Sequence, residues 1–205
     1  MLLEEARSTQ LEAARLNHDL KSPLYAEAIA TELCAVEATA WRWAEAHDRA
    51  RQELAARTYR TTYPGLTRWY ETVALVRAGE AELVHTDLRR FAGQPGFSPR
   101  AHVQYLRGLA ALATHTGDLD EARRNLRQAR RLARRIRLPG ELWEICATLG
   151  ALDRAAGDER SARRSFAQAT QILQALATSI EDEALRAAFL SAAPAHQALV
   201  YQPLA

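Results

Sequence analysis

The chain lacks several features that mark common protein classes. Its two cysteines, Cys34 and Cys146, stand alone without a CxxC pair or a nearby ligand partner, which argues against a disulfide framework and for small buried thiols. No stretch approaches the ~20 apolar residues that a membrane helix needs, so we expect no membrane partner. The first residues show no basic segment followed by an apolar run, and we therefore expect a cytoplasmic location.

Familiar catalytic motifs are missing as well. The sequence contains no HExxH, no GxSxG and no GxxxxGK[ST] phosphate loop. Apart from His18, the histidines show no i, i+4 pairing with a second metal ligand. We therefore predict a non-catalytic protein without a metal or a cofactor.

Charge is nearly balanced, and strand periodicity is absent. The formal net charge is +2, so the whole chain has no strong field that would indicate nucleic acid as its partner. Apolar residues recur at helical spacing, while proline and glycine fall mostly at the edges of these periodic segments. Ser22 and Ser98, each followed by proline, are suited to helix starts, and Ser179 is expected to cap a last helix. These patterns predict an all-α fold.

Two segments repeat one pattern closely. Residues 106–136 and 146–176 each contain a leucine followed by a small residue, a Gly-Asp turn, and a small, a bulky and a small residue. The matching sets are Leu109-Ala110, Gly117-Asp118, Ala122, Leu126 and Ala129, and then Leu149-Gly150, Gly157-Asp158, Ala162, Phe166 and Ala169. Asp118 and Asp158 are placed to cap the helices that follow the turns.

Two weaker copies precede these segments. One surrounds Gly79, with Thr72 in place of a small residue, and the other surrounds Trp41, with no turn glycine and with Glu53 where a small residue is expected. Gly79, Gly117 and Gly157 are spaced by 38 and 40 residues. A period of this length, made of two helices per unit, indicates a helical solenoid.

On these residues the chain resembles the tetratricopeptide repeat (TPR) family. Its long period is similar to the variant found in the maltose-operon activator and in large bacterial signalling ATPases. The resemblance implies an α-solenoid over 21–178 with about four repeats, which we place at 23–60, 63–95, 98–137 and 139–178, followed by a capping helix and tail at 179–205. The helix at 1–20 resembles the second helix of a preceding repeat, which implies a C-terminal fragment of a longer protein.

The resemblance also implies a function and a surface. Proteins of this kind act as scaffolds or sensors in bacterial signalling or transcriptional control, and they bind a protein, a peptide or a small effector on the concave face lined by the first helices. On repeat geometry, the candidates on that face are Trp69, Arg77, Gln104, Arg107, Thr114, Glu144 and Arg154.

A second candidate surface lies on the predicted helix 118–137. Its eight arginines cover about 160° of the helix circumference, and apolar residues cover the opposite side. The candidate basic patch consists of Arg123, Arg127, Arg130, Arg131 and Arg134. Such a stripe can meet phosphates or an acidic protein, so nucleic-acid binding is one alternative function. Because no aromatic residue interleaves the arginines, we favour a solvated face and regard nucleic acid as the less favoured partner.

The segment from His18 to Leu24 gives the other alternative. It resembles the phospho-acceptor box of sensor histidine kinases, with His18 as the acceptor, and so implies a phosphotransfer remnant. A complete kinase also needs an ATP-binding domain with glycine-rich loops, and none follows in the sequence. The competing interpretation is a helix end, a loop and the start of the next helix.

Overall fold

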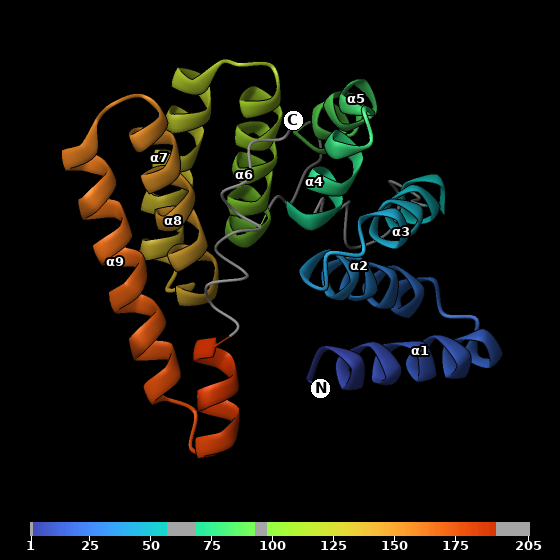
Figure 1. Cartoon of the computed structure of the whole chain (residues 1–205). Coiled ribbons are helices and arrows are strands. Elements are labelled where there is room, and N and C mark those ends of the chain that lie inside the picture. Colours follow the sequence, from blue (N-terminus) through green and yellow to red (C-terminus); the bar gives the residue numbers. More distant parts are fainter. Residues whose placement is uncertain (1, 57–68, 93–97, 192–205) are drawn as a thin grey trace. The chain divides into compact units, whose positions relative to one another are not determined.

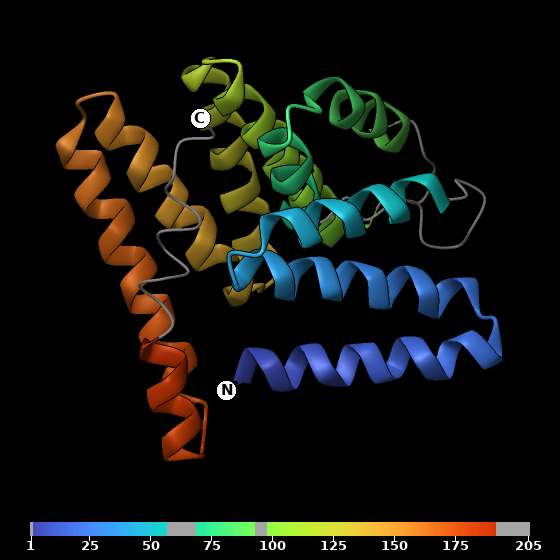
Figure 2. The ribbon, with the colours of Figure 1, turned by 45° about the vertical axis from the view of Figure 1, so that its right-hand side comes forward.

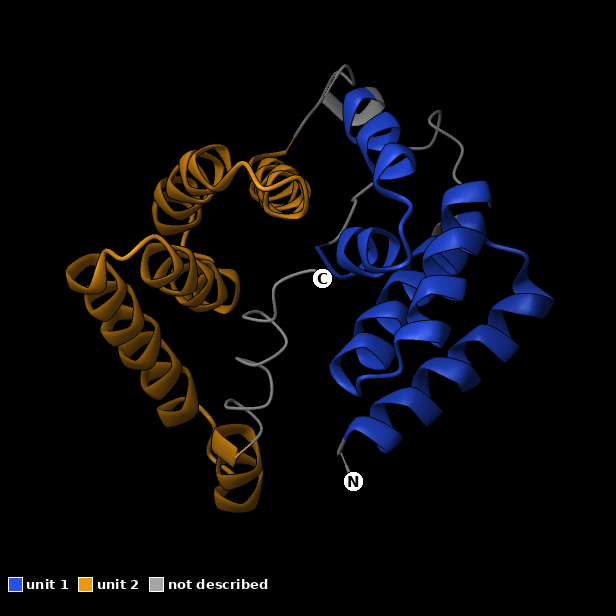
Figure 3. Cartoon of the chain, turned by 45° about the horizontal axis from the view of Figure 1, so that its top comes forward, with its two compact units in different colours: residues 1–97 blue, residues 98–205 orange. Residues whose placement is uncertain are grey.

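The structure is a computed structural model that describes residues 2–56, 69–92 and 98–191. Over these residues the protein is all-α, and consecutive helices pack as antiparallel pairs (Figure 1), which confirms the predicted fold class. The chain divides into two compact units, Met1–Phe97 and Ser98–Ala205 (Figure 3). The predicted repeat boundary at 60–63, the predicted end of the second repeat at 95 and the tail from 192 onward lie outside the described residues.

Unit 1 contains the helices α1 to α5. Their bounds are α1 Leu2–Leu20, α2 Pro23–Thr39, α3 Trp43–Ala56, α4 Trp69–Arg77 and α5 Ala81–Ala92. In this unit α2 packs between α1 and α3, as Figure 2 shows, and α4 packs against α2, α3 and α5. The helix α1, which lacked an obvious partner in the sequence, therefore packs on α2.

Unit 2 contains the helices α6 to α9 and a short final helix. Their bounds are α6 Pro99–His115, α7 Leu119–Arg135, α8 Pro139–Ala155 and α9 Glu159–Thr178, and residues 183–191 are also helical. Each of α6 to α9 packs against its neighbour in the chain. The assignment of these helices to numbered repeats stays a prediction.

The turn glycines occupy equivalent positions. Gly79, Gly117 and Gly157 separate α4 from α5, α6 from α7, and α8 from α9, with φ of 81°, 82° and 79°. This left-handed conformation is the usual end of a helix and favours glycine, because it has no Cβ. Trp41 takes the same place between α2 and α3 with φ 62°, so this hairpin makes its turn without glycine.

The aspartates that follow two of these turns cap the next helices, as the sequence predicts. Asp118 Oδ1 accepts a hydrogen bond from the backbone N–H of Glu121 at 2.9 Å, and Asp158 Oδ1 accepts one from the N–H of Ser161 at 3.0 Å. Each bond satisfies an amide that has no partner inside its helix.

The helix start predicted at Ser22 is confirmed, whereas the cap predicted at Ser179 is wrong. Ser22 stands at the N-cap of α2, but its side chain makes no capping hydrogen bond. Ser179 is instead the C-cap of α9, and its hydroxyl donates to the carbonyl oxygen of Leu176 at 2.7 Å. The final helix is capped by Asp182, whose Oδ1 accepts from the N–H of Leu185 at 2.8 Å. A carboxylate at this position satisfies an unpaired amide and also meets the positive end of the helix dipole.

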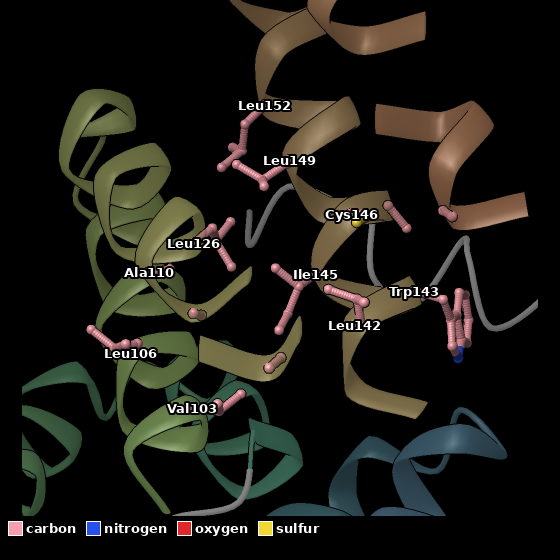
Figure 4. Packing of buried hydrophobic residues seen from close by; sticks show 14 of the residues in the cluster. Val103, Leu106, Ala110, Leu126, Leu142, Trp143, Ile145, Cys146, Leu149 and Leu152 are labelled. Atoms are coloured by element: carbon pink, nitrogen blue, oxygen red, sulfur yellow. The ribbon is translucent and has the colours of Figure 1, made fainter. Parts of the chain in front are cut away.

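The core of unit 2 is a single apolar cluster. Side chains from α6, α7, α8 and α9 contribute to it, and Figure 4 shows Leu126 and Ile145 among them. Position 150 has no room for a side chain, because a Cβ added to Gly150 would lie 2.6 Å from Cε1 of Phe166. The preceding repeat places Ala110 and Leu126 at the corresponding positions. A smaller residue on one helix therefore accompanies a larger one on the next, which keeps the interior filled.

The core of unit 1 includes buried charge. Glu37 is 1% exposed, and its two carboxylate oxygens lie 2.7 Å from Arg7 Nε and 2.5 Å from Arg42 Nε. Arg42 also reaches Glu4 on α1 at 2.8 Å. This network links α1, α2 and the turn before α3 through a carboxylate that would otherwise be costly to bury.

Candidate functional site

The arginine-rich helix α7 buries its apolar face and leaves its arginine face on the outside, as the sequence predicts. Ala122, Leu126, Ala129, Leu132 and Ala133 are buried against the neighbouring helices. The arginines lie on the other side, with Arg127, Arg131 and Arg134 exposed and Arg123 and Arg130 half-buried. Arg123 and Arg130 therefore lie at the edge of this basic face, next to the adjacent helices, while the other three arginines face solvent.

Residues of α7, α8 and α9 line a cavity in unit 2, and α8 packs against both of the other helices. Its volume is about 350 Å³, which is at the lower end of the range of ligand pockets. Its lining residues are Arg127, Arg130, Leu149, Asp153, Ser161, Arg164, Ser165 and Gln168. We call this cavity the α7–α9 groove, and all three of its helices belong to unit 2.

The α7–α9 groove carries a positive charge. Arg127 and Arg130 reach it from α7 and Arg164 from α9, whereas Asp153 is the single acidic residue in its lining. Arg164 Nη2 donates to Ser161 Oγ at 3.0 Å, which orients this guanidinium near the start of α9. Guanidinium groups on two facing helices can bind one anion from both sides.

Asp153 occupies an unusual environment at the base of the groove. It is 4% exposed, and its Oδ1 lies 3.7 Å from Arg127 Nη2 and 4.0 Å from Arg123 Nη1. Among the described residues no donor makes a hydrogen bond to this buried oxygen. Buried acceptors are usually satisfied, so Asp153 can still accept a hydrogen bond from a bound group.

The field of the α7 arginines extends into the core. Burial raises the pKa of the Cys146 thiol on α8, while Arg130 and Arg134 act in the opposite direction by stabilising the thiolate.

The candidates predicted for the concave face of unit 2 make internal contacts. Arg107 on α6 and Glu144 on α8 are both buried and form an ion pair, with Nη2 and Oε2 2.5 Å apart. Gln104 is also buried. Thr114 Oγ1 donates to the carbonyl oxygen of Ala110 at 2.8 Å.

The remaining three candidates contact aromatic rings. The guanidinium of Arg154 lies 5.3 Å from the ring centroid of Phe166, and that of Arg77 lies 4.6 Å from the ring of Trp43. Trp69 is 7% exposed. Four of the seven residues are buried, Arg77 and Thr114 are half-buried and Arg154 is exposed, and their role in binding a ligand stays a prediction.

His18 is exposed in the last turn of α1. Lys21 follows with φ 51°, and Asn17 Nδ2 donates to the carbonyl oxygen of Ser22 at 3.1 Å, so the segment forms a helix end, a turn and the next helix start. Its role as a phospho-acceptor stays a hypothesis. Within the described ranges, no three His, Cys, Asp or Glu residues are grouped to hold a metal, and no helix has the length and apolar character needed to cross a bilayer.

Sequence reasoning missed most of the groove on the α8 and α9 sides. The missed polar residues are Asp153, Ser161, Arg164, Ser165 and Gln168. Asp153 carried a signal, since the preceding repeat has Ala113 at the corresponding position. An acidic residue in the apolar part of a repeat indicates a buried charge that needs a partner.

Comparison with known proteins adds little to this geometry. Neither a family model nor a curated protein matches the chain. Among solved structures, the chain is similar to one titled "Crystal structure of BtubC (BKLC) from P. vanneervenii", with 15% sequence identity and a TM-score of 0.34 over 89% of this chain and 95% of that one. A likeness this weak carries no argument about function.

Proposed function

We propose that the protein is a non-catalytic helical scaffold that binds an acidic segment of a partner protein in the α7–α9 groove. The observation that carries this proposal is the convergence of Arg127, Arg130 and Arg164 on one cavity of about 350 Å³. A cavity of this size accommodates one or two side chains of an extended segment rather than a folded surface. Guanidinium groups bind carboxylates and phosphates through paired, charge-assisted hydrogen bonds.

The charge balance favours the groove over the predicted concave-face residues. Arg107 is already neutralised by Glu144 and is 3% exposed, so ligand binding there would require this pair to separate. In the groove three arginines face one aspartate. Arg127 already lies 3.7 Å from Asp153, but among the described residues Arg130 and Arg164 form no ion pair, so an acidic ligand gains attraction from these two arginines without breaking a buried pair.

Binding in the groove gives the scaffold a way to act as a sensor. A ligand held by Arg130 of α7 and Arg164 of α9 contacts both helices at once. It therefore favours the spacing of α7 and α9 that fits the ligand. Such a bias can be transmitted to an attached domain, in keeping with a role in signalling or transcriptional control.

Fluorescence anisotropy with the full chain tests this proposal. The probe is a labelled glutamate-rich peptide, and the control is a glutamine peptide of equal length. The R127Q/R130Q/R164Q variant should lose at least about tenfold in affinity, because charge-assisted hydrogen bonds are removed. The matched R124Q/R131Q/R163Q variant removes three charges from the same two helices outside the groove and should lose much less. Equal losses would contradict the groove, and no binding of the glutamate peptide would contradict the function.

Nucleic-acid binding is the second candidate, supported by the exposed Arg127, Arg131 and Arg134 on α7. A single-stranded oligonucleotide in the same assay tests it. If this function holds, the oligonucleotide binds more tightly than the peptide, its affinity falls steeply with salt, and charge reversal of these three arginines abolishes binding. Weak binding that is insensitive to the reversal would remove this candidate.

A further inference from the structure

We infer that the α7–α9 groove is a phosphomonoester site whose natural occupant is a phosphorylated serine or threonine of the docking segment. This inference rests on the proposed function, because it specifies the acidic group that the groove receives. Three observations carry it: the charge of the lining, the arrangement of the donors, and the state of Asp153.

The first observation is the charge balance. Three guanidinium groups and one carboxylate line the groove, which leaves an excess of two positive charges. A carboxylate side chain supplies one negative charge, whereas a phosphomonoester carries about 1.5 to 2 at neutral pH. A single phosphomonoester comes close to neutralising the groove, whereas a single carboxylate does not, so the phosphomonoester should bind more tightly than one glutamate or aspartate side chain.

The second observation is where the donors lie. Arg127 and Arg130 approach from α7, while Arg164, Ser161 and the buried Ser165 approach from α9. A carboxylate has two oxygens in one plane and suits a single guanidinium, whereas a phosphate presents three terminal oxygens in different directions. Donors on two facing helices therefore match the tetrahedral group better.

The third observation concerns the source of the phosphate. The buried Oδ1 of Asp153 receives no hydrogen bond from a described residue, although it lines the groove. A phosphate dianion has only acceptors and would not satisfy this oxygen. The backbone N–H of a peptide that carries the phosphate would satisfy it. Asp153 therefore favours a phosphorylated peptide over a free phosphate compound.

Three labelled peptides that differ only at the central residue test the inference on the full chain. This residue is phosphoserine, glutamate or serine, and unlabelled phenyl phosphate serves as a free phosphomonoester competitor. We expect the phosphoserine peptide to bind at least about tenfold more tightly than the glutamate peptide, since it makes additional charge-assisted bonds. We also expect phenyl phosphate to compete only at much higher concentration than the unlabelled phosphopeptide.

Matched variants locate the binding. R130Q/R164Q removes one groove arginine from each of α7 and α9 and should abolish the preference for phosphoserine. R131Q/R163Q removes two charges from the same helices outside the groove and should preserve the preference. D153A should weaken the phosphopeptide, because it removes the oxygen that accepts the peptide N–H, but should leave phenyl phosphate binding equal or stronger, because a negative charge next to the phosphate is lost. Circular dichroism of each variant confirms that the helices remain folded.

The outcomes separate this inference from the proposed function. Equal affinity for the phosphoserine and glutamate peptides, lost in R130Q/R164Q, would overturn the phosphomonoester site while the acidic-segment function stands. Binding of phenyl phosphate in the groove without binding of any peptide would overturn the peptide source and the proposed function together. Loss of the preference in R131Q/R163Q as large as in R130Q/R164Q would overturn the groove as its location.

Discussion

In unit 2 the interior is a continuous apolar cluster with two buried carboxylates, Glu144 and Asp153, each close to an arginine, whereas in unit 1 four carboxylates are buried among the apolar side chains. These carboxylates are Glu37, Glu53, Glu71 and Asp87. Unit 2 also has the closer copies of the repeat pattern. Two departures from this pattern in unit 1, Glu53 and Thr72, are themselves buried, at 5% and 0% exposure. At the first of these positions the packing brings in a polar partner, since Glu53 Oε2 accepts a hydrogen bond from Thr31 Oγ1 at 3.3 Å.

The largest expected effect comes from the ion pairs of the two units. R107M in unit 2 leaves Glu144 buried without its cation and should lower the free energy of unfolding by about 3–5 kcal/mol. R7M in unit 1 should cost about 1 kcal/mol or less, because Arg7 is 35% exposed and Glu37 retains Arg42. Urea unfolding gives the totals, and native-state hydrogen exchange assigns each loss to one unit.

The double variant R107M/E144L tests the cause of that loss. Because it removes both charges, it should recover most of the stability that R107M loses. If the double variant is no more stable than R107M, the loss is due to packing rather than to an unpaired carboxylate.

The next effect concerns two neighbouring repeats within unit 2. G150A places a methyl group 2.6 Å from the Phe166 ring and should cost about 1–3 kcal/mol. The double variant G150A/F166L reproduces the Ala110 and Leu126 combination of the preceding repeat and should be more stable than G150A alone. Thermal unfolding of the three variants and the wild type forms a double-mutant cycle. Additive effects would show that the two positions do not compensate each other.

The fold could be predicted further than the candidate site because its signals are local. Gly117 and Asp118 predict a turn and a helix cap from neighbouring residues, and the apolar side of α7 follows from helical spacing alone. The groove depends on which residues of α7 and α9 meet across α8. Arg164 is separated from Arg130 by more than thirty residues of sequence, and nothing local indicates that the two line one cavity. Arg107 and Glu144 belong to the predicted ligand-binding face, and they pair with each other. Helix spacing indicates which residues share a face but not which side chains pair across helices, and the role of these two residues in ligand binding stays a prediction.

A smaller effect compares the turns of the two units. G117A in unit 2 should cost about 1 kcal/mol, because its φ of 82° strains a residue with a Cβ. Trp41 already bears this strain at φ 62°, so W41G should be more stable than W41A by a similar amount. The comparison with W41A separates backbone strain from the edge contact between Trp41 and Trp43, whose ring centroids lie 6.4 Å apart. Equal stability of W41G and W41A would mean that the turn is not strained.

The last effect depends on pH and compares the two cysteines. Burial raises the pKa of the Cys34 thiol above its ordinary 9.0, and the carboxylates of Glu71, Glu53 and Glu37 raise it further. The folded chain therefore keeps this proton at a pH where the unfolded chain loses it. The stabilisation is complete below about pH 9 and should fall by up to about 1.4 kcal/mol for each unit above it.

Urea unfolding between pH 8 and 10.5 measures this loss, and C34A should remove it. Burial also raises the pKa of the Cys146 thiol, but Arg130 and Arg134 oppose the shift, so C146A should change the pH dependence less. The two thiols thus report the local charge of the two units, with carboxylates around Cys34 and arginines beside Cys146. If C34A and C146A change the pH dependence of the unfolding free energy equally, burial alone sets the two thiol pKa values. The nearby carboxylates and arginines then have no measurable effect on the two thiols.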